Sequence, residues 1–219
     1  MQPDYQRAAT LALETLIRHR VSYAPVAPLP ILKATPGVIV LSYADMADTI
    51  GVERSCVLNN LSAQTHDATT VIDVHNGRRR YVIGYNRQLP NYITDRALAR
   101  ELGHIILGHD GTRPDDVRKE EASMFARHLL CPRPLIRAIQ DAGIAITSDL
   151  LGNTTGCYER CQSCLASSPA IHTAPELNRL VRAQFQPYVD NLADYIPIFA
   201  QDDHSVPVEF GGYMEGYEE

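Results

Sequence analysis

The sequence contains no tryptophan, few cysteines and no surplus of positive charge. It has no apolar run of about 18 residues or more, which excludes a transmembrane helix. The first residues lack the basic-then-apolar layout of a signal peptide. Five cysteines in 219 residues do not form the dense, paired framework of a small secreted protein. These absences predict a cytoplasmic protein.

The charge is negative and unevenly distributed. The chain carries 20 Lys and Arg against 26 Asp and Glu, and this balance does not indicate the basic face of a nucleic-acid-binding protein. Six of the acidic residues lie after residue 200, where there is no Lys or Arg. We therefore expect a solvated, disordered acidic tail over 201–219. The rest of the chain is long enough for one substantial domain with a small appendage.

Hydrophobic periodicity predicts a mixed α+β fold. Asn76-Gly77 separates two β-prone runs, 69–75 and 79–85, and is a strong signal for a type I′ hairpin. A helix is expected from Thr94 or Asp95 to Gly108, and a second over 116–130. The remaining expected elements are a strand over 37–43 and helices over 5–19, 31–33, 44–50, 52–61, 135–141, 148–151, 155–166 and 174–200, the last interrupted near Pro187 and Pro197.

The segment Arg100-Glu101-Leu102-Gly103-His104 is the most informative part of the chain. Positions 100 and 104 stack on one face of a helix. With histidine at both, the segment would bind one zinc ion, and the intervening Glu would act as general base. The chain has Arg100 instead, and a guanidinium has no lone pair for a metal.

Residues 94–109 and 121–132 together resemble the ImmA/IrrE metallopeptidase family. The pattern of that family is A-H-E-L-G-H-I-x-L-G-H, followed by E-x-x-A-N-x-F-A-x-x-L-L-x-P. Segments 81–86 and 29–32 also resemble its N-terminal half. The resemblance spans about residues 5–135 and implies a zincin-like α+β domain over 1–135, with a small twisted sheet packed on helices. A helical C-terminal region would follow over 136–200.

The resemblance also assigns roles to individual residues. Glu101 matches the general base and His104 the second zinc-ligating histidine. Arg100 stands where the first histidine belongs, and Lys119 where the ligand Glu of the next helix belongs. Glu120 or Glu121 is then the acid left for a metal, and zinc is the implied cofactor.

Two functions follow from this assignment. The first is a regulatory protein with a degenerate metal site, which binds a protein partner with weak or no proteolysis. The second is an active zinc endopeptidase that uses His104, Glu120 or Glu121, and Glu101 as base. In both, the resemblance implies a helix-turn-helix transcriptional repressor as partner, often in mobile-element or stress regulation. A pure binding module that uses the cleft or the C-terminal helices is a third hypothesis.

Arg100 and the other histidines allow further interpretations. Arg100 is predicted to form an ion pair with Glu120 or Glu121, which would replace a metal crosslink by a charge-assisted hydrogen bond. A relocated metal site built from His104, His109, His128 and nearby acids is an alternative. His104 and His109 share a face only if Gly108 ends the helix.

Three cysteines form a separate pattern in the C-terminal region. Cys157, Cys161 and Cys164, with Cys131 as a fourth ligand, have spacing that suits zinc or an iron–sulfur cluster. The same spacing lies on one helix face, which favours a buried core stripe. Residues 148–166 also suit a helix pair, for which partner docking is a better prediction than DNA reading.

Overall fold

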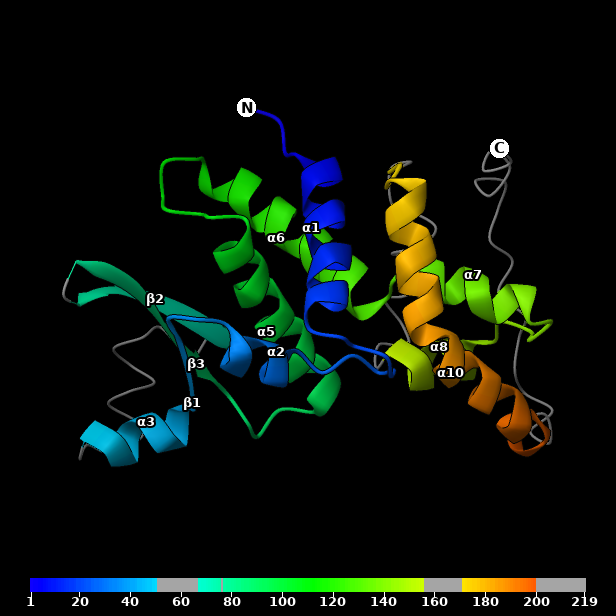
Figure 1. Cartoon of the computed structure of the whole chain (residues 1–219). Helices are drawn as coiled ribbons and strands as arrows, with labels where there is room; N and C mark the ends of the chain where they lie inside the picture. Colours follow the sequence, from blue (N-terminus) through cyan, green and yellow to red (C-terminus); the bar gives the residue numbers. More distant parts are fainter. Residues whose placement is uncertain (51–66, 76, 156–170, 200–219) are drawn as a thin grey trace. The chain divides into compact units, whose positions relative to one another are not determined.

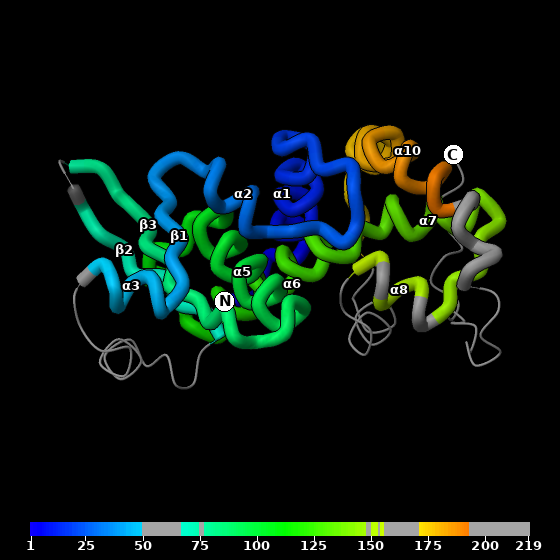
Figure 2. Tube along the Cα trace, turned by 90° about the horizontal axis from the view of Figure 1, so that it is seen from below, coloured from blue at the N-terminus to red at the C-terminus, as the bar shows by residue number. Residues whose placement is uncertain are grey.

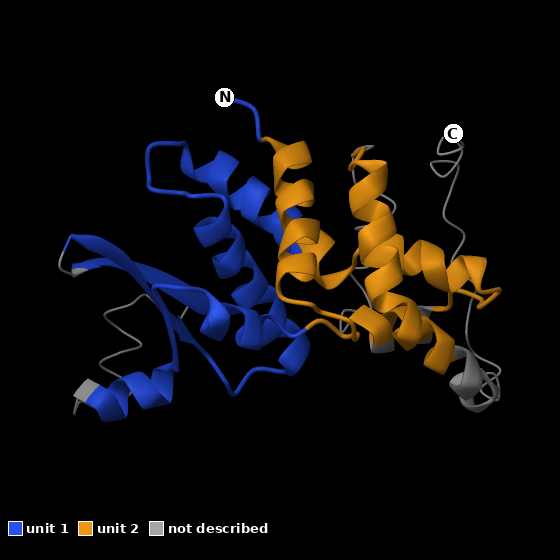
Figure 3. Ribbon diagram, viewed as in Figure 1, with its two compact units in different colours: residues 1–3, 27–126 blue, residues 4–26, 127–219 orange. Residues whose placement is uncertain are grey.

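The computed structural model divides the chain into two compact units (Figure 3). Unit 1 comprises residues 1–3 and 27–126, and unit 2 comprises residues 4–26 and 127–219. The fold is α+β, as the sequence predicts. None of the helices in the described part of the chain is long and apolar enough to cross a membrane. The structure describes residues 1–50, 67–75, 77–155 and 171–199.

Unit 1 contains a three-stranded sheet in the order β1-β3-β2 (Figure 1). β1 (Val38–Ser42) runs parallel to β3 (Arg78–Tyr85), and β2 (Ala68–His75) runs antiparallel to it. Gly77 has a φ of 72°, a left-handed conformation that glycine adopts without steric cost. The predicted hairpin is thus confirmed. β2 is an edge strand, and no described strand pairs with its outer side.

Two helices of unit 1 carry the sequence motif. α5 (Asn91–Ile106) packs against β2 and β3, and α6 (Asp115–Leu130) begins within the same unit. Gly103 allows α5 and α6 to approach closely, because a Cβ there would lie 3.1 Å from the Ala122 carbonyl oxygen. α2 (Pro28–Ala34) contacts both α5 and β1 (Figure 2), and α3 (Tyr43–Ile50) follows β1 directly.

Unit 2 is helical in its described part. α1 (Tyr5–Arg18) and α7 (Arg133–Asp141) both contact α10 (Pro175–Phe199), and α8 (Ser148–Thr155) lies between α7 and α10 in the sequence. The Gln184 amide donates hydrogen bonds to the carbonyls of Leu16 (2.9 Å) and Val21 (2.6 Å). These bonds tie α10 to the last turn of α1 and to the segment that follows it.

Two predictions about the helices are wrong, one about where α5 begins and one about an interruption of α10. α5 begins at Asn91 rather than at Thr94 or Asp95, because the Pro90 carbonyl already accepts hydrogen bonds from the Ile93 and Thr94 amides. α10 continues through Pro187 and Pro197 without the predicted interruption.

Burial explains why α10 continues through Pro187. The side chains of Phe185 and Val189 on either side of it are fully buried, and tertiary packing outweighs the hydrogen bond that one proline removes.

Other predictions fall outside the described residues. They concern the helix over 52–61, nearly all of the helix over 155–166, the Cys157, Cys161 and Cys164 pattern, and the acidic tail. The domains over 1–135, 136–200 and 201–219 also stay a prediction.

Candidate functional site

A cavity of about 350 Å³ lies in unit 1, lined by residues of β2, β3, α5 and the first turns of α6. Its wall includes the motif residues Glu101 and His104. It also includes Arg100 and Lys119, the two cations at the positions of the expected zinc ligands. The fold therefore places these four residues in the wall of one cavity.

Glu101 is held at the edge strand. The Thr70 hydroxyl of β2 donates a 2.5 Å hydrogen bond to Oε2 of Glu101. Burial, together with the nearby Glu101 and Asp67 carboxylates, raises the pKa of Tyr43 to about 12. Glu101 is thus tied to the sheet at one wall of the cavity.

His104 is joined to His109, five residues later. Gly108 has a φ of 71° and ends α5, so that the His109 amide donates to the His104 carbonyl at 3.0 Å. The two rings meet edge to face, with 2.8 Å between their Nδ1 atoms. The helix thus ends at Gly108, which is the condition under which His104 and His109 can lie on the same side.

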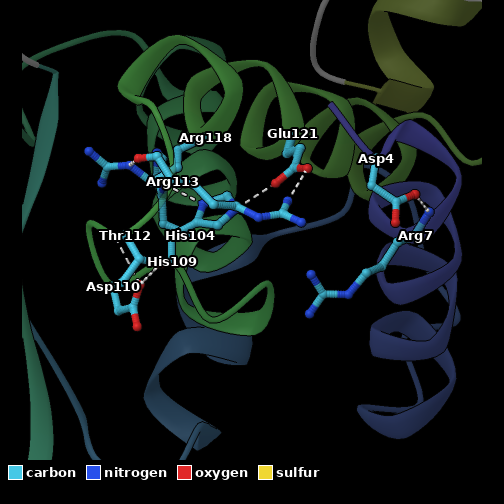
Figure 4. A network of polar contacts seen from close by, with 9 residues as sticks. All are labelled: Asp4, Arg7, His104, His109, Asp110, Thr112, Arg113, Arg118 and Glu121. Carbon is cyan, nitrogen blue, oxygen red and sulfur yellow. Dashed lines mark hydrogen bonds and ion pairs between the residues drawn. The ribbon is translucent and has the colours of Figure 1, made fainter. Parts of the chain in front are cut away.

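A buried chain of contacts continues from His109 to α6 (Figure 4). Nε2 of His109 lies 2.9 Å from Oε2 of Glu121, whose side chain has no exposed surface. The Arg113 guanidinium pairs with Oε1 of the same carboxylate. A carboxylate only accepts, so Nε2 of His109 must donate to Glu121, and the lone pair of its Nδ1 then accepts from Nδ1 of His104.

Both histidines are neutral in this arrangement. Burial, together with the neighbouring His109 and Arg100, lowers the pKa of His104 to about 4. Burial also lowers the pKa of His109, although Glu121 opposes the shift. The Glu121 carboxylate therefore takes its balancing positive charge from Arg113.

The predicted ion pair between Arg100 and an acid of α6 is wrong. Glu121 pairs with Arg113, which the α5–α6 link places beside it, and Glu120 lies exposed on α6. Nε of Arg100 is buried, and no described group accepts a hydrogen bond from it. An unmet buried donor of this kind costs about 1–3 kcal/mol.

The residues present do not fit a three-ligand zinc site. Arg100 offers no lone pair, and Nζ of Lys119 is engaged with Asp115 at 2.5 Å. Both oxygens of Glu121 are occupied, which leaves His104 as the one ligand at the expected positions. Among the described residues, no three or more His, Cys, Asp or Glu are placed to hold a metal ion.

His128, the third histidine of the relocated-site hypothesis, lies outside the cavity wall. It is buried in α6, and its Nε2 has no hydrogen-bond partner in the described residues. Burial lowers the pKa of His128 to about 3, so it is neutral. His128 is therefore not one of the residues that line the cavity with His104 and His109.

Residues 58–151 match the IrrE N-terminal-like domain, a peptidase family. The matched range contains the whole cavity wall. This part of the chain is similar to that family. The resemblance to ImmA/IrrE proteins is thereby confirmed, and no curated protein and no solved structure shows significant similarity to the chain.

Sequence reasoning missed Thr70 and Arg113, which hold the carboxylates of Glu101 and Glu121. Thr70 lies 31 residues before Glu101, in a strand whose facing depends on its register with β3. Arg113 belongs to the link between α5 and α6, where no periodic pattern predicts the direction of a side chain. Neither residue belongs to the family pattern from which the site was predicted.

Proposed function

We propose that this IrrE-like chain binds a protein partner and has weak or no zinc-dependent proteolysis. One observation carries the proposal: Arg100 and Lys119 line the same cavity as Glu101 and His104. Two cations at ligand positions repel a divalent metal and offer it no lone pair. The cavity thus keeps the place of a peptidase site and loses the ligands that such a site needs.

The neighbouring strand supports an extended segment as the bound group. β2 is an edge strand, and an extended peptide can add to such an edge by main-chain hydrogen bonds. Ile72, which lines the cavity, is 45% exposed, and Val74 beyond it is 65% exposed. These side chains suit apolar groups of the partner. A helix-turn-helix repressor as partner, and a cytoplasmic location, rest on the family resemblance.

Metal content tests the loss of zinc chemistry. We expect the purified protein to contain no stoichiometric zinc and to keep its melting temperature in the presence of a chelator. Zinc at one equivalent, lost in His104→Ala, would overturn the proposal. We expect the double variant Arg100→His with Lys119→Glu to bind one zinc ion, and its failure would contradict the assignment of these two positions.

Peptide retention tests the binding role. A pooled library of random heptapeptides is passed over the immobilised protein, and the retained peptides are identified by mass spectrometry. We expect retention by the wild type and loss in Ile72→Lys, which places a charge in the cavity wall. Ile39→Lys is the matched control, because Ile39 is 41% exposed on β1 at the other edge of the sheet. Equal retention by both variants would exclude this surface.

An active zinc endopeptidase is the second candidate. The observation in its favour is that Glu101 and His104, the base and one ligand of such an enzyme, line one cavity. Glu121 is buried in its own contacts, so Glu120 is the remaining acid; it is exposed on α6 and does not line the cavity, so this candidate requires α6 to rotate. Zinc-dependent hydrolysis of the retained peptides, abolished in Glu101→Gln, would establish this candidate in place of the first.

A further inference from the structure

We infer that Arg100 recognises a carboxylate of the bound segment, supplied by an Asp or Glu side chain or by a C-terminus. The inference rests on the proposed function and names the chemistry that the cavity selects. Arg100 then has a role in binding a ligand, and is more than a position at which a zinc ligand has been lost.

The first argument is that Arg100 lacks a counter-charge. Among the described residues no acid forms an ion pair with it, and its buried Nε has no hydrogen-bond acceptor. A guanidinium that lines a cavity without a counter-charge favours an occupant that carries a negative charge.

The second argument is that the acids of the cavity wall are already engaged. Asp67 pairs with Arg96 at 3.6 Å, and Glu101 accepts the Thr70 hydroxyl at 2.5 Å. Asp115 pairs with both Arg118 at 2.9 Å and Lys119 at 2.5 Å. Each acid of the described wall therefore has a partner other than Arg100, and Arg100 forms no ion pair with any of them.

The third argument concerns the neighbour of Arg100 one turn along α5. His104 is neutral, and its Nδ1 hydrogen is directed to His109. It therefore neither cancels the charge of Arg100 nor competes with it for an anion. Because a guanidinium binds a carboxylate through two parallel N–H···O bonds, Arg100 would fix the orientation of the segment as well as its charge.

The neighbouring apolar wall defines the ligand further. Ile72 and Tyr81, paired across β2 and β3, line the same cavity as Arg100. The expected ligand is thus an extended peptide with a carboxylate close to an apolar side chain. A neutral peptide would bind the apolar wall and leave the Arg100 charge without a counter-charge.

The heptapeptide library, prepared once with free and once with amidated C-termini, tests the inference. We expect retained peptides to be enriched in carboxylates, and Arg100→Gln to weaken their binding by roughly 10- to 100-fold, as expected for loss of a hydrogen bond between charged groups. Enrichment of Asp and Glu in the amidated library identifies a side chain as the source. Retention limited to the free-acid library identifies the C-terminus.

The control is Arg87→Gln, which removes the same charge from a residue that is 61% exposed and lies outside the cavity wall. It should bind as the wild type does. Retention of peptides without carboxylate preference, or a preference that persists in Arg100→Gln, would overturn the inference while leaving the proposed function intact. Retention of no peptide would instead overturn the proposed function.

A second measurement tests Arg100 without any peptide. Acetate is titrated into ¹⁵N-labelled protein, and the Nε–H resonance of Arg100 is assigned by its loss in Arg100→Lys. We expect acetate to shift this resonance at concentrations at which chloride does not. An unchanged resonance would overturn the inference whatever the library shows. Thermal melting of both Arg100 variants verifies that they fold.

Discussion

The two halves of the candidate site differ in how their polar groups are satisfied. We call His104, His109, Arg113 and Glu121 the closed half. His104 contacts His109, and both His109 and Arg113 contact the fully buried Glu121. We call the wall formed by Arg100, Glu101 and the β2 residues Thr70 and Ile72 the open half. The closed half resembles a structural crosslink. In the open half, Nε of Arg100 has no hydrogen-bond partner among the described residues, and the apolar side chain of Ile72 is exposed. Under the proposed function, the first half contributes stability and the second contributes recognition.

Removal of Glu121 should have the largest effect on stability. Glu121→Leu leaves the buried His109 and the Arg113 guanidinium without their shared acceptor. We expect the free energy of unfolding to fall by about 3–5 kcal/mol, the usual cost of breaking a buried ion pair. Urea denaturation measures it. The control Glu120→Leu, on the exposed face of α6, should change it by less than about 0.5 kcal/mol. Similar losses in both variants would contradict a closed structural half.

The closed half should also make stability depend on pH. In the folded state the pKa of His104 is about 4 and that of His109 is lowered, whereas the ordinary value is 6.5. As pH falls from about 6.5 towards 4, the unfolded chain therefore takes up protons that the folded chain cannot, and stability is lost. A single group contributes up to about 1.4 kcal/mol per pH unit.

Denaturation at several pH values measures this slope, and His104→Gln should reduce it. His128, whose pKa is lowered to about 3, contributes with the same sign and is present in both proteins, so that the difference reports the closed half. Thr70→Val, a change in the open half, should keep the wild-type slope. An unchanged slope in His104→Gln would show that this histidine is not held neutral by folding.

The sequence predicted the framework of the site but not its internal partners. The hairpin follows from Asn76-Gly77, and the paired helices follow from apolar spacing and the motif, since these signals are local. The joining of His104 to His109 was predictable on one condition, that Gly108 ends α5, and this condition is met.

The partner of Glu121 was not predictable in the same way. From the sequence alone, either Arg100 or Arg113 could pair with Glu121. The conformation of the link between α5 and α6 places Arg113 beside it. Thr70 depends on the register of β2 against β3, which pairs it with Ile83. Such contacts arise from tertiary geometry, so a motif identifies the position of a residue without identifying what it binds.

The smallest effect is expected in the open half, from Thr70→Val. This change removes the 2.5 Å hydrogen bond to Glu101 and keeps the size and β-branching of the side chain. We expect a loss of about 1 kcal/mol or less, because Glu101 borders a cavity where water can replace the hydroxyl. Thr69→Val, the same substitution one residue earlier in β2, is the matched control. If Thr70→Val instead cost as much as Glu121→Leu, the open half would be as structural as the closed half, and Glu101 would belong to the scaffold rather than to a binding surface.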